Sequence, residues 1–230
     1  MALYVIGDLH LSLESDKPMD AFGQGWDDYV NRIKAGFEKL TPDDVCVLCG
    51  DLSWASSLKT SVSDFRFISN LPGKKIALKG NHDHWWSTIA KMDAFFALHD
   101  LSGIQILSNN CFYYGDMAIC GSRGWTIENK ADAARNDMMV RREANRLNLS
   151  LEAAGDATEK LCFLHYPPIF RGLRCRELID VMLAHGVRRC WYGHIHGYGH
   201  NYAVQGCVDG IDYRMISADY INFTPQKICD

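Results

Sequence analysis

The chain of 230 residues contains no apolar run that approaches the roughly 18 residues of a membrane-spanning helix. It also lacks a basic excess, since 24 Lys and Arg residues stand against 28 Asp and Glu residues and the formal net charge is −4. Proteins that coat nucleic acid have the opposite balance, so general nucleic-acid binding is not expected. No internal repeat, low-complexity tract or linker divides the chain, and we expect a single domain over residues 1–230.

A second Cys-x-x-Cys pair is also absent, although Cys46 and Cys49 form one. A structural zinc site needs four ligands, and positions three apart in an extended strand face opposite sides. The nine cysteines lie mostly as single residues inside apolar runs, where a free thiol behaves as a small hydrophobic side chain. The N-terminal apolar run is too short for a secretion signal. Together these features predict reduced thiols and a cytoplasmic protein.

Short apolar runs recur along the chain, and several are continuous rather than alternating, as in strands that are covered on both faces. Helical spacing appears between them, for example at Tyr29, Ile33 and Phe37. Asp209-Gly210 between two apolar runs predicts a β-hairpin. We therefore expect an α/β fold with sheets inside and helices outside. The expected strands are Leu3–Ile6, Val45–Cys49, Lys75–Leu78, Met117–Cys120, Leu161–Leu164 and Arg189–Tyr192, and helices are expected from Asp28, around Phe65–Leu71, at Ile89–His99 and at Leu178–Leu183.

Residue types that bind metals follow five of these strands. Ligands collect beyond the carboxyl ends of strands in α/β sheets, and residues two apart can face the same side of an extended backbone. A glycine precedes three of the positions, where the absence of Cβ permits a close approach. Asp51 or Asn81 alone is better explained as a polar turn residue, and His165 alone as a structural histidine, but all seven together predict one shared site. The seven are Asp8, His10, Asp51, Asn81, His165, His194 and His196.

These residues carry a family resemblance. The ordered motifs Asp8-x-His10, Gly50-Asp51, Gly80-Asn81-His82-Asp83, His165 and Gly193-His194-x-His196 resemble the signature of the calcineurin-like metallophosphoesterases. The resemblance implies a four-layer β-sandwich of mixed sheets flanked by helices. It also implies two metal ions, one held by Asp8, His10, Asp51 and His196 and the other by Asp51, Asn81, His165 and His194.

Asp51 suits the bridging position because a carboxylate offers two oxygens. Only Asp8 and Asp51 bring negative charge against two divalent ions, so the pair stays electron-deficient and can acidify a bridging water. The mixed oxygen and imidazole donors suit Mn²⁺, Fe or Zn²⁺. The resemblance places His82 opposite the leaving group, with Asp83 orienting its imidazole. The expected reaction is in-line attack of a metal-bound hydroxide on phosphorus, without a covalent enzyme intermediate.

The residues that bind the rest of the substrate are less defined. Arg123, which follows the expected strand Met117–Cys120, is a candidate to grip phosphate, although a salt bridge explains it equally well. Trp125 and three other tryptophans after strand ends can stack on a base or sugar, but we expect at least half of them in the core. The long loop Leu11–Asp27 is a candidate lid. The three other tryptophans are Trp54, Trp85 and Trp86. His84 and His200 lie near the motifs without an assigned role, and we expect both to be ordinary surface histidines.

Residues 123–149 carry five arginines in an acidic chain. They form either a basic surface that attracts an anionic substrate or a solvated helix whose arginines pair with its own acids. Met139, Arg142, Arg146 and Leu149 share one face of that helix. The arginines are Arg123, Arg135, Arg141, Arg142 and Arg146, and the candidate acids are Glu128, Asp132, Asp137 and Glu143.

Three functions compete. The main hypothesis is hydrolysis of a small or medium phosphodiester or phosphomonoester. Protein dephosphorylation is disfavoured because Gly50-Asp51 continues into Leu-Ser-Trp-Ala-Ser-Ser, whereas the protein phosphatase branch has a stretch with a phosphate-gripping arginine. A nuclease is the second hypothesis, weakened by the acidic balance. A non-catalytic protein-binding scaffold is the third, and it is disfavoured because no expected ligand has been lost.

Overall fold

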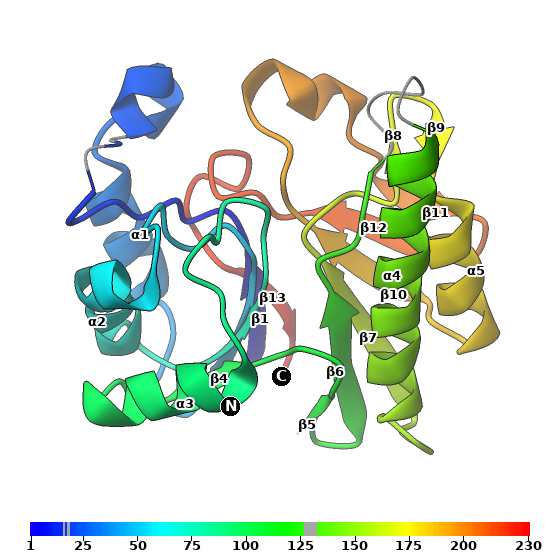
Figure 1. The fold of residues 1–230 in the computed structure, drawn as a ribbon, viewed down its shortest axis with the longest axis horizontal. Helices are drawn as coiled ribbons and strands as arrows, with labels where there is room; N and C mark the ends of the chain where they lie inside the picture. The colour runs from blue at the N-terminus through cyan, green and yellow to red at the C-terminus, as the bar shows by residue number, and fades with distance from the viewer. Residues whose placement is uncertain (16, 18, 127–132) are drawn as a thin grey trace.

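The computed structural model describes residues 1–15, 17, 19–126 and 133–230. Two mixed β-sheets lie face to face, and helices cover the outer face of each (Figure 1). This arrangement of helices, sheet, sheet and helices confirms the predicted fold class.

The first sheet has the strand order β13-β1-β2-β3-β4, in which only the edge strand β13 runs antiparallel to its neighbour. The helices of the N-terminal half cover its outer face, as the left side of Figure 1 shows. The strands are β1 Leu3–Ile6, β2 Val45–Cys49, β3 Lys74–Leu78, β4 Ile104–Ile106 and β13 Gln226–Cys229, and the helices are α1 Tyr29–Phe37, α2 Val62–Asn70 and α3 Ile89–Leu98.

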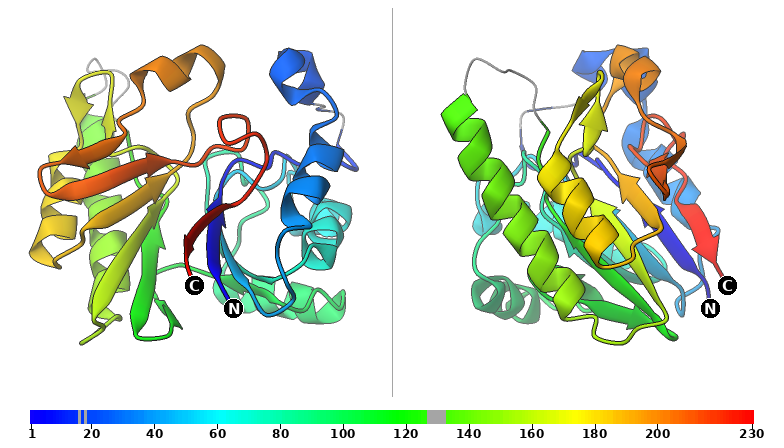
Figure 2. Two further views of the ribbon diagram at one scale, coloured as in Figure 1. Left: turned by 180° about the vertical axis from the view of Figure 1, so that it is seen from behind. Right: turned by 90° about the vertical axis from the view of Figure 1, so that its right-hand side faces the viewer.

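The second sheet has the order β11-β12-β10-β7-β6-β5, with a parallel centre and antiparallel strands at both edges. Two helices cover its outer face, and the rear and side views in Figure 2 show them beside the sheet. The strands are β5 Phe112–Tyr114, β6 Met117–Ser122, β7 Glu159–Leu164, β10 Arg189–Tyr192, β11 Gly206–Val208 and β12 Ile211–Met215. The helices are α4 Ala133–Glu152 and α5 Arg176–Ala184. A small separate hairpin consists of β8 Ile169–Phe170 and β9 Leu173–Arg174.

The continuous hydrophobicity of the central strands follows from this layering. In β2, Cys46 and Leu48 pack under the helices, whereas Val47 and Cys49 pack between the two sheets. Each strand must therefore be apolar on both faces. Cys46 and Cys49 lie on opposite faces of β2, as the strand period predicted.

Helix α4 packs on the core with a different face from the mixed one that Met139, Arg142, Arg146 and Leu149 share. Its buried side chains include Val140, Ala144 and Leu147, while Leu149 is exposed. The predicted hairpin is present, with Asp209 and Gly210 both at positive φ, as a tight two-residue turn requires. Its first strand is the short β11, and a 3-10 helix over Gly197–Tyr202 precedes it.

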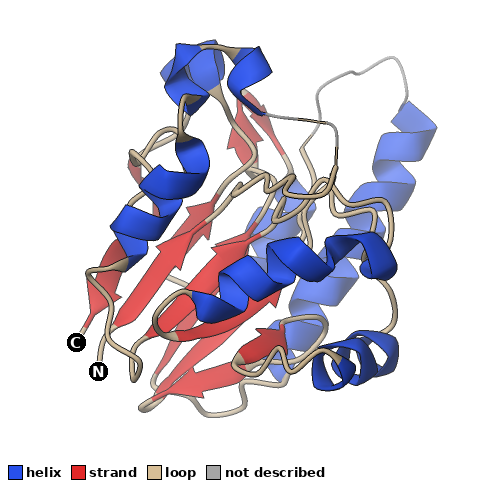
Figure 3. Ribbon diagram, turned by 90° about the vertical axis from the view of Figure 1, so that its left-hand side faces the viewer, coloured by secondary structure: helices blue, strands red, loops and turns tan. Residues whose placement is uncertain are grey.

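The parallel strands of both sheets end on one side of the molecule. An isolated bridge from Gly7 to Ser217 joins the two sheets at that end. Figure 3 shows the loops that gather beyond these strand ends. Among the described residues, no helix combines the length and the apolar character needed to cross a membrane.

Candidate metal centre and the cavities beside it

The expected ligands lie in the turns after β1, β2, β3, β7 and β10. Four of them adopt the left-handed backbone conformation that non-glycine residues rarely populate. Such strain persists where surrounding contacts hold it, and it concentrates at functional sites. The φ angles are 60° at Asp8, 46° at His10, 51° at Asp51 and 74° at His194.

Glycines allow these turns to approach one another closely. A Cβ on Gly80 would lie 2.1 Å from Oδ1 of Asp51, and a Cβ on Gly193 would lie 2.3 Å from Oδ2 of Asp8. Neither position tolerates a side chain without movement of an expected ligand. The glycines before Asn81 and His194 are therefore part of how the site is built.

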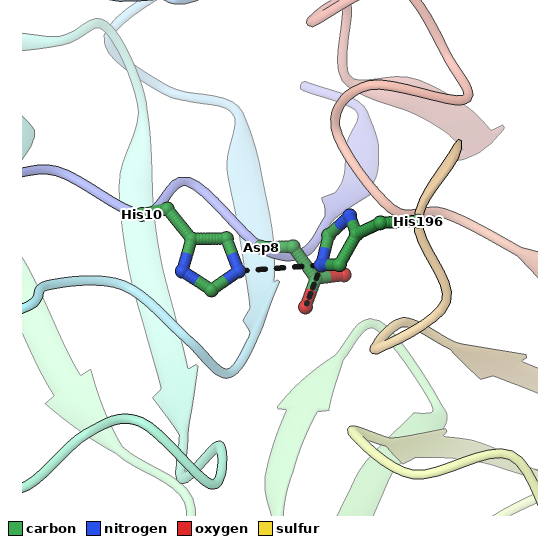
Figure 4. Close-up of side chains that lie close together, drawn as sticks. All are labelled: Asp8, His10 and His196. Atoms are coloured by element: carbon green, nitrogen blue, oxygen red, sulfur yellow. Dashed lines mark hydrogen bonds and ion pairs between the residues drawn. The ribbon is translucent and has the colours of Figure 1, made fainter. Parts of the chain in front are cut away.

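Asp8, His10 and His196 form one group, drawn in Figure 4. One ligand atom from each lies within 4.8 Å of the other two. Nε2 of His10 is 3.2 Å from Nε2 of His196, which in turn is 3.8 Å from Oδ1 of Asp8. Two imidazole nitrogens that face each other beside a carboxylate are suited to share one cation.

Asp51, His165 and His194 form a second group of the same kind. Oδ1 of Asn81 lies 2.6 Å from Nε2 of His165, so the amide also faces this group. Nδ1 of His165 lies 3.1 Å from the carbonyl oxygen of Cys49, a contact that fixes the orientation of the ring.

Asp51 connects the two groups through a single oxygen. Its Oδ2 lies 3.7 Å from Nε2 of His10 and 3.5 Å from Nε2 of His165. Its Oδ1 accepts the backbone N–H of His82 at 2.7 Å. The carboxylate is therefore held by one oxygen and presents the other to both groups.

Burial makes this cluster unfavourable for the chain alone. Burial, opposed by His196 and reinforced by Asp51, raises the pKa of Asp8 to about 8. Burial likewise lowers the pKa of His10 to about 3 and that of His165 well below its ordinary value. The Asp8 carboxyl resists ionisation beside two imidazoles that resist protonation, so added positive charge would favour the ionised carboxylate and the neutral rings that ligate a metal.

Asp83 does not orient the imidazole of His82, although we had expected it to. Its carboxylate accepts the backbone N–H groups of Gly80, Asp51, Leu52 and Ser53 and the indole N–H of Trp85, at 2.7 to 3.3 Å. These contacts commit Asp83 to the β2 and β3 turns rather than to the imidazole of His82. Its role in the structure is to position Asp51.

Asp219 was not identified from the sequence. Its Oδ1 lies 2.9 Å from Nδ1 of His196, and its Oδ2 lies 3.2 Å from Nε2 of His200. His200 thus contacts the Asp219 carboxylate behind the metal centre, whereas we expected an ordinary surface histidine. The available signal was the strand-end pattern itself, because Asp219 follows β12 just as the other site residues follow their strands.

A cavity of about 560 Å³ opens onto both groups, and we call it the histidine cavity. His82 lines it, and so do Trp26 and Met19 from the expected lid loop. Trp54 also lines it, stacked on His10 at 5.1 Å and tilted against His82 at 4.3 Å between ring centroids. Of the four tryptophans considered, Trp85 is a core residue.

Arg123 lies elsewhere. It lines a second cavity of about 300 Å³ together with Lys79, Arg142, Glu143 and Arg146, which we call the basic cavity. Nη2 of Arg123 is 3.2 Å from Oε1 of the buried Glu143. No residue lines both cavities in the described part of the chain.

The remaining described residues that we expected around the substrate do not line the histidine cavity. Trp125 packs against Tyr166, whose ring lies 4.3 Å from that of His194, so Trp125 is one aromatic ring removed from the site. Arg141 pairs with Asp137 on the surface. Glu128, Asp132 and the side chain of Arg135 lie outside the described residues.

The sequence matches the family model of the calcineurin-like phosphoesterases over residues 1–198. The chain belongs to this family. It is accordingly a metal-dependent phosphoesterase, and the family implies divalent metal ions. The two groups of Asp and His side chains, most of them buried, fit such ions.

Several solved structures share the fold of this chain. The phosphopantetheinyl hydrolase of Mycobacterium tuberculosis is 14% identical with a TM-score of 0.56, covering 99% of this chain and 95% of its own. A protein of unknown function from Aquifex aeolicus is 15% identical with a TM-score of 0.52, covering 98% and 95%. A Thermus thermophilus protein is 11% identical with a TM-score of 0.51, covering 99% and 97%. No curated protein sequence matches the chain significantly.

Proposed function

We propose that this phosphoesterase uses two metal ions that share Asp51. Asp8, His10 and His196 would complete the ligands of one ion, and Asn81, His165 and His194 those of the other. The observation that carries the proposal is that Oδ2 of Asp51 faces both groups, at 3.7 Å from His10 and 3.5 Å from His165. A carboxylate in that position can serve both ions through one oxygen.

The donors suit transition metals. Imidazole nitrogens outnumber carboxylates in the set, which favours Mn²⁺, Fe or Zn²⁺ over the all-oxygen sites of Ca²⁺. When bound, the two ions would acidify a water between them and neutralise charge on the phosphate. The chain contributes the orientation of each ligand, through Asp219 behind His196, the Cys49 carbonyl behind His165 and Asp83 behind Asp51.

His82 is the residue that we assign to the leaving group. It is half-buried, lines the histidine cavity and is anchored through its backbone N–H to Asp51. Burial, only partly offset by Asp51, lowers the pKa of its imidazole, so the ring is mainly neutral near pH 7. A neutral imidazole still carries one N–H, which can donate a hydrogen bond to the departing oxygen.

We further propose that the substrate is a phosphodiester with an apolar or planar group. Trp26, Trp54 and Met19 give the histidine cavity an apolar wall, and neither Lys nor Arg is among its described lining residues. The ammonium of Lys17 lies 5.0 Å from the ring centroid of Trp54 but does not line the cavity. A dianionic monoester would therefore depend chiefly on the metals for charge compensation, whereas a monoanionic diester needs less. The phosphopantetheinyl hydrolase of M. tuberculosis supports the fold, and the substrate class rests on this cavity.

The test compares two chromogenic esters on metal-reconstituted protein. We expect kcat/KM for bis(p-nitrophenyl) phosphate to exceed that for p-nitrophenyl phosphate by about tenfold or more. Asp51→Asn should abolish both activities and lower the metal content. A preference for the monoester would overturn the proposed substrate class alone. Full activity with one ion per chain would overturn the two-metal proposal.

A further inference from the structure

The basic cavity has a charge opposite to that of the whole protein. Four of its lining side chains are cationic and one is anionic, a local excess of three positive charges (4 − 1) in a chain of net charge −4. Cations gather against their mutual repulsion only where something compensates them. The cationic residues are Lys79, Arg123, Arg142 and Arg146, and the anionic residue is Glu143.

Glu143 compensates part of this charge and shapes the wall. Its side chain is fully buried, and its Oε1 alone contacts Nη2 of Arg123 at 3.2 Å and Nη1 of Arg146 at 2.8 Å. One carboxylate therefore holds two guanidinium groups and neutralises only one of them. This contact explains the position of Arg123 and Arg146. It leaves unexplained why Lys79 and Arg142 line the same cavity.

The polar residues of the cavity are also donors. Ser108 and Ser122 line it beside the four cations. The hydroxyl oxygen of Ser122 accepts the backbone N–H of Gly124 at 3.1 Å, so its hydrogen is directed elsewhere. Guanidinium, ammonium and hydroxyl donors around a small cavity match the oxygens of a tetrahedral oxyanion, with arginine supplying a planar fork.

The basic cavity is built on the strand ends of the metal centre but is separate from it. Lys79 lies just before Gly80 and Asn81, and the carbonyl of Arg123 accepts the backbone N–H groups of His165 and Tyr166 at 3.2 and 2.9 Å. The opposite wall comes from α4, which Figure 1 shows along the outer face of the second sheet. The two cavities thus share a backbone frame without sharing lining side chains.

We propose that the basic cavity is a binding site for a phosphate-class oxyanion, distinct from the histidine cavity. The ligand is free phosphate or one phosphate group of a phosphorylated molecule. Its binding requires the cations of α4 and of the β3 and β6 turns, and it does not depend on the metal ions or on the proposed substrate.

The test is calorimetric titration of the full chain with inorganic phosphate and with pyrophosphate, before and after removal of metals by a chelator. We expect wild-type binding to persist after chelation and Arg142→Ala to weaken it about tenfold. Arg142 is exposed, so the variant should fold as the wild type does, and thermal unfolding checks this. The matched control is Arg141→Ala, which removes an adjacent arginine of the same helix that pairs with Asp137 and does not line the cavity.

The outcomes separate the possibilities. Much tighter binding of pyrophosphate supports a phosphorylated molecule as the ligand, and equal affinities support free phosphate. Binding that disappears with the metals and is the same in Arg141→Ala and Arg142→Ala would place the anion in the histidine cavity and overturn the proposal. Absence of binding to the wild type would overturn it as well.

Discussion

Oδ1 of Asp219 lies 2.9 Å from Nδ1 of His196, and Nε2 of the same imidazole faces His10 and Asp8. Asp219 also accepts the backbone N–H of Gly197 at 3.1 Å. Burial opposes protonation of His196, but the hydrogen bond to Asp219 and the charge of Asp8 raise its pKa to about 9. The carboxylate therefore fixes the orientation of the ring and makes it more basic, which strengthens a metal ligand.

Asp219→Asn should weaken metal binding by about 10- to 100-fold, the usual effect of losing a carboxylate behind a histidine ligand. The amide keeps the shape of the side chain but removes its charge. Competition with a chelating dye measures the affinity, and Asp180→Asn on the exposed face of α5 serves as the control. Unchanged affinity for both ions would mean that Asp219 only orders the turn.

His82→Ala should retain the metal content of the wild type and lose about two to four orders of magnitude in kcat. His82 lines the histidine cavity without belonging to either ligand group, so its loss affects the reaction rather than the ions. Elemental analysis and turnover are measured on the same preparation. His84→Ala, two residues away and exposed, should leave both unchanged. A loss of metal in His82→Ala would make His82 a ligand.

The central strands were predictable because burial on both faces leaves continuous apolar runs such as Val45–Cys49. The edge strands of the first sheet were not. Ile104–Ile106 and Gln226–Cys229 are short, and Gln226 and Lys227 are exposed, so no hydrophobic pattern marks them. They are strands because a neighbour pairs with them, which is a tertiary effect.

The proximity of the expected ligands was predictable because the carboxyl ends of parallel strands lie along the same edge of a sheet. The partners of individual side chains were not. Asp83 is adjacent to His82 in sequence, yet its carboxylate turns to the amides of Asp51 and its neighbours. Arg123 was placed on the correct strand end, but its pairing with Glu143 depends on how α4 packs. Side-chain direction at a turn is decided by tertiary packing.

Lys75 gives a pH-dependent prediction about stability. It is 2% exposed, its ammonium donates to the carbonyl of Leu71, and burial lowers its pKa from 10.5 to about 8. Between these two values the unfolded chain binds the proton more tightly than the folded protein does, so this group makes wild-type stability rise with pH. Lys75→Met removes the effect. The free energy of unfolding of Lys75→Met, taken relative to that of wild type, should therefore fall by an amount on the order of 1 kcal/mol as the pH rises from about 8 to about 10.

Urea denaturation at both pH values measures this difference. Lys74→Met is the control, because it removes the exposed neighbouring lysine of the same strand. Equal pH dependence in the two variants would show that Lys75 stays protonated throughout.

Trp54 is the residue through which we expect the histidine cavity to select its substrate. It contacts the rings of His10 and His82, and the ammonium of Lys17 lies 5.0 Å from its ring centroid. Trp54 also lines the cavity, so an aromatic group on the phosphate would stack on the part of the ring that faces the cavity. Stacking on an aromatic side chain contributes about 1–3 kcal/mol. Trp54→Ala should therefore raise the inhibition constant of diphenyl phosphate about tenfold or more and leave that of dimethyl phosphate nearly unchanged. Both constants are measured at saturating metal, because Trp54 also supports His10.

Trp86→Ala is the matched control for this experiment, since Trp86 lines the basic cavity instead. It should change neither inhibition constant. If Trp54→Ala weakened both inhibitors equally, the tryptophan would act only by supporting His10 and His82. Selection would then rest with Met19 and Trp26 of the Leu11–Asp27 loop, the other apolar side chains that line the histidine cavity among the described residues.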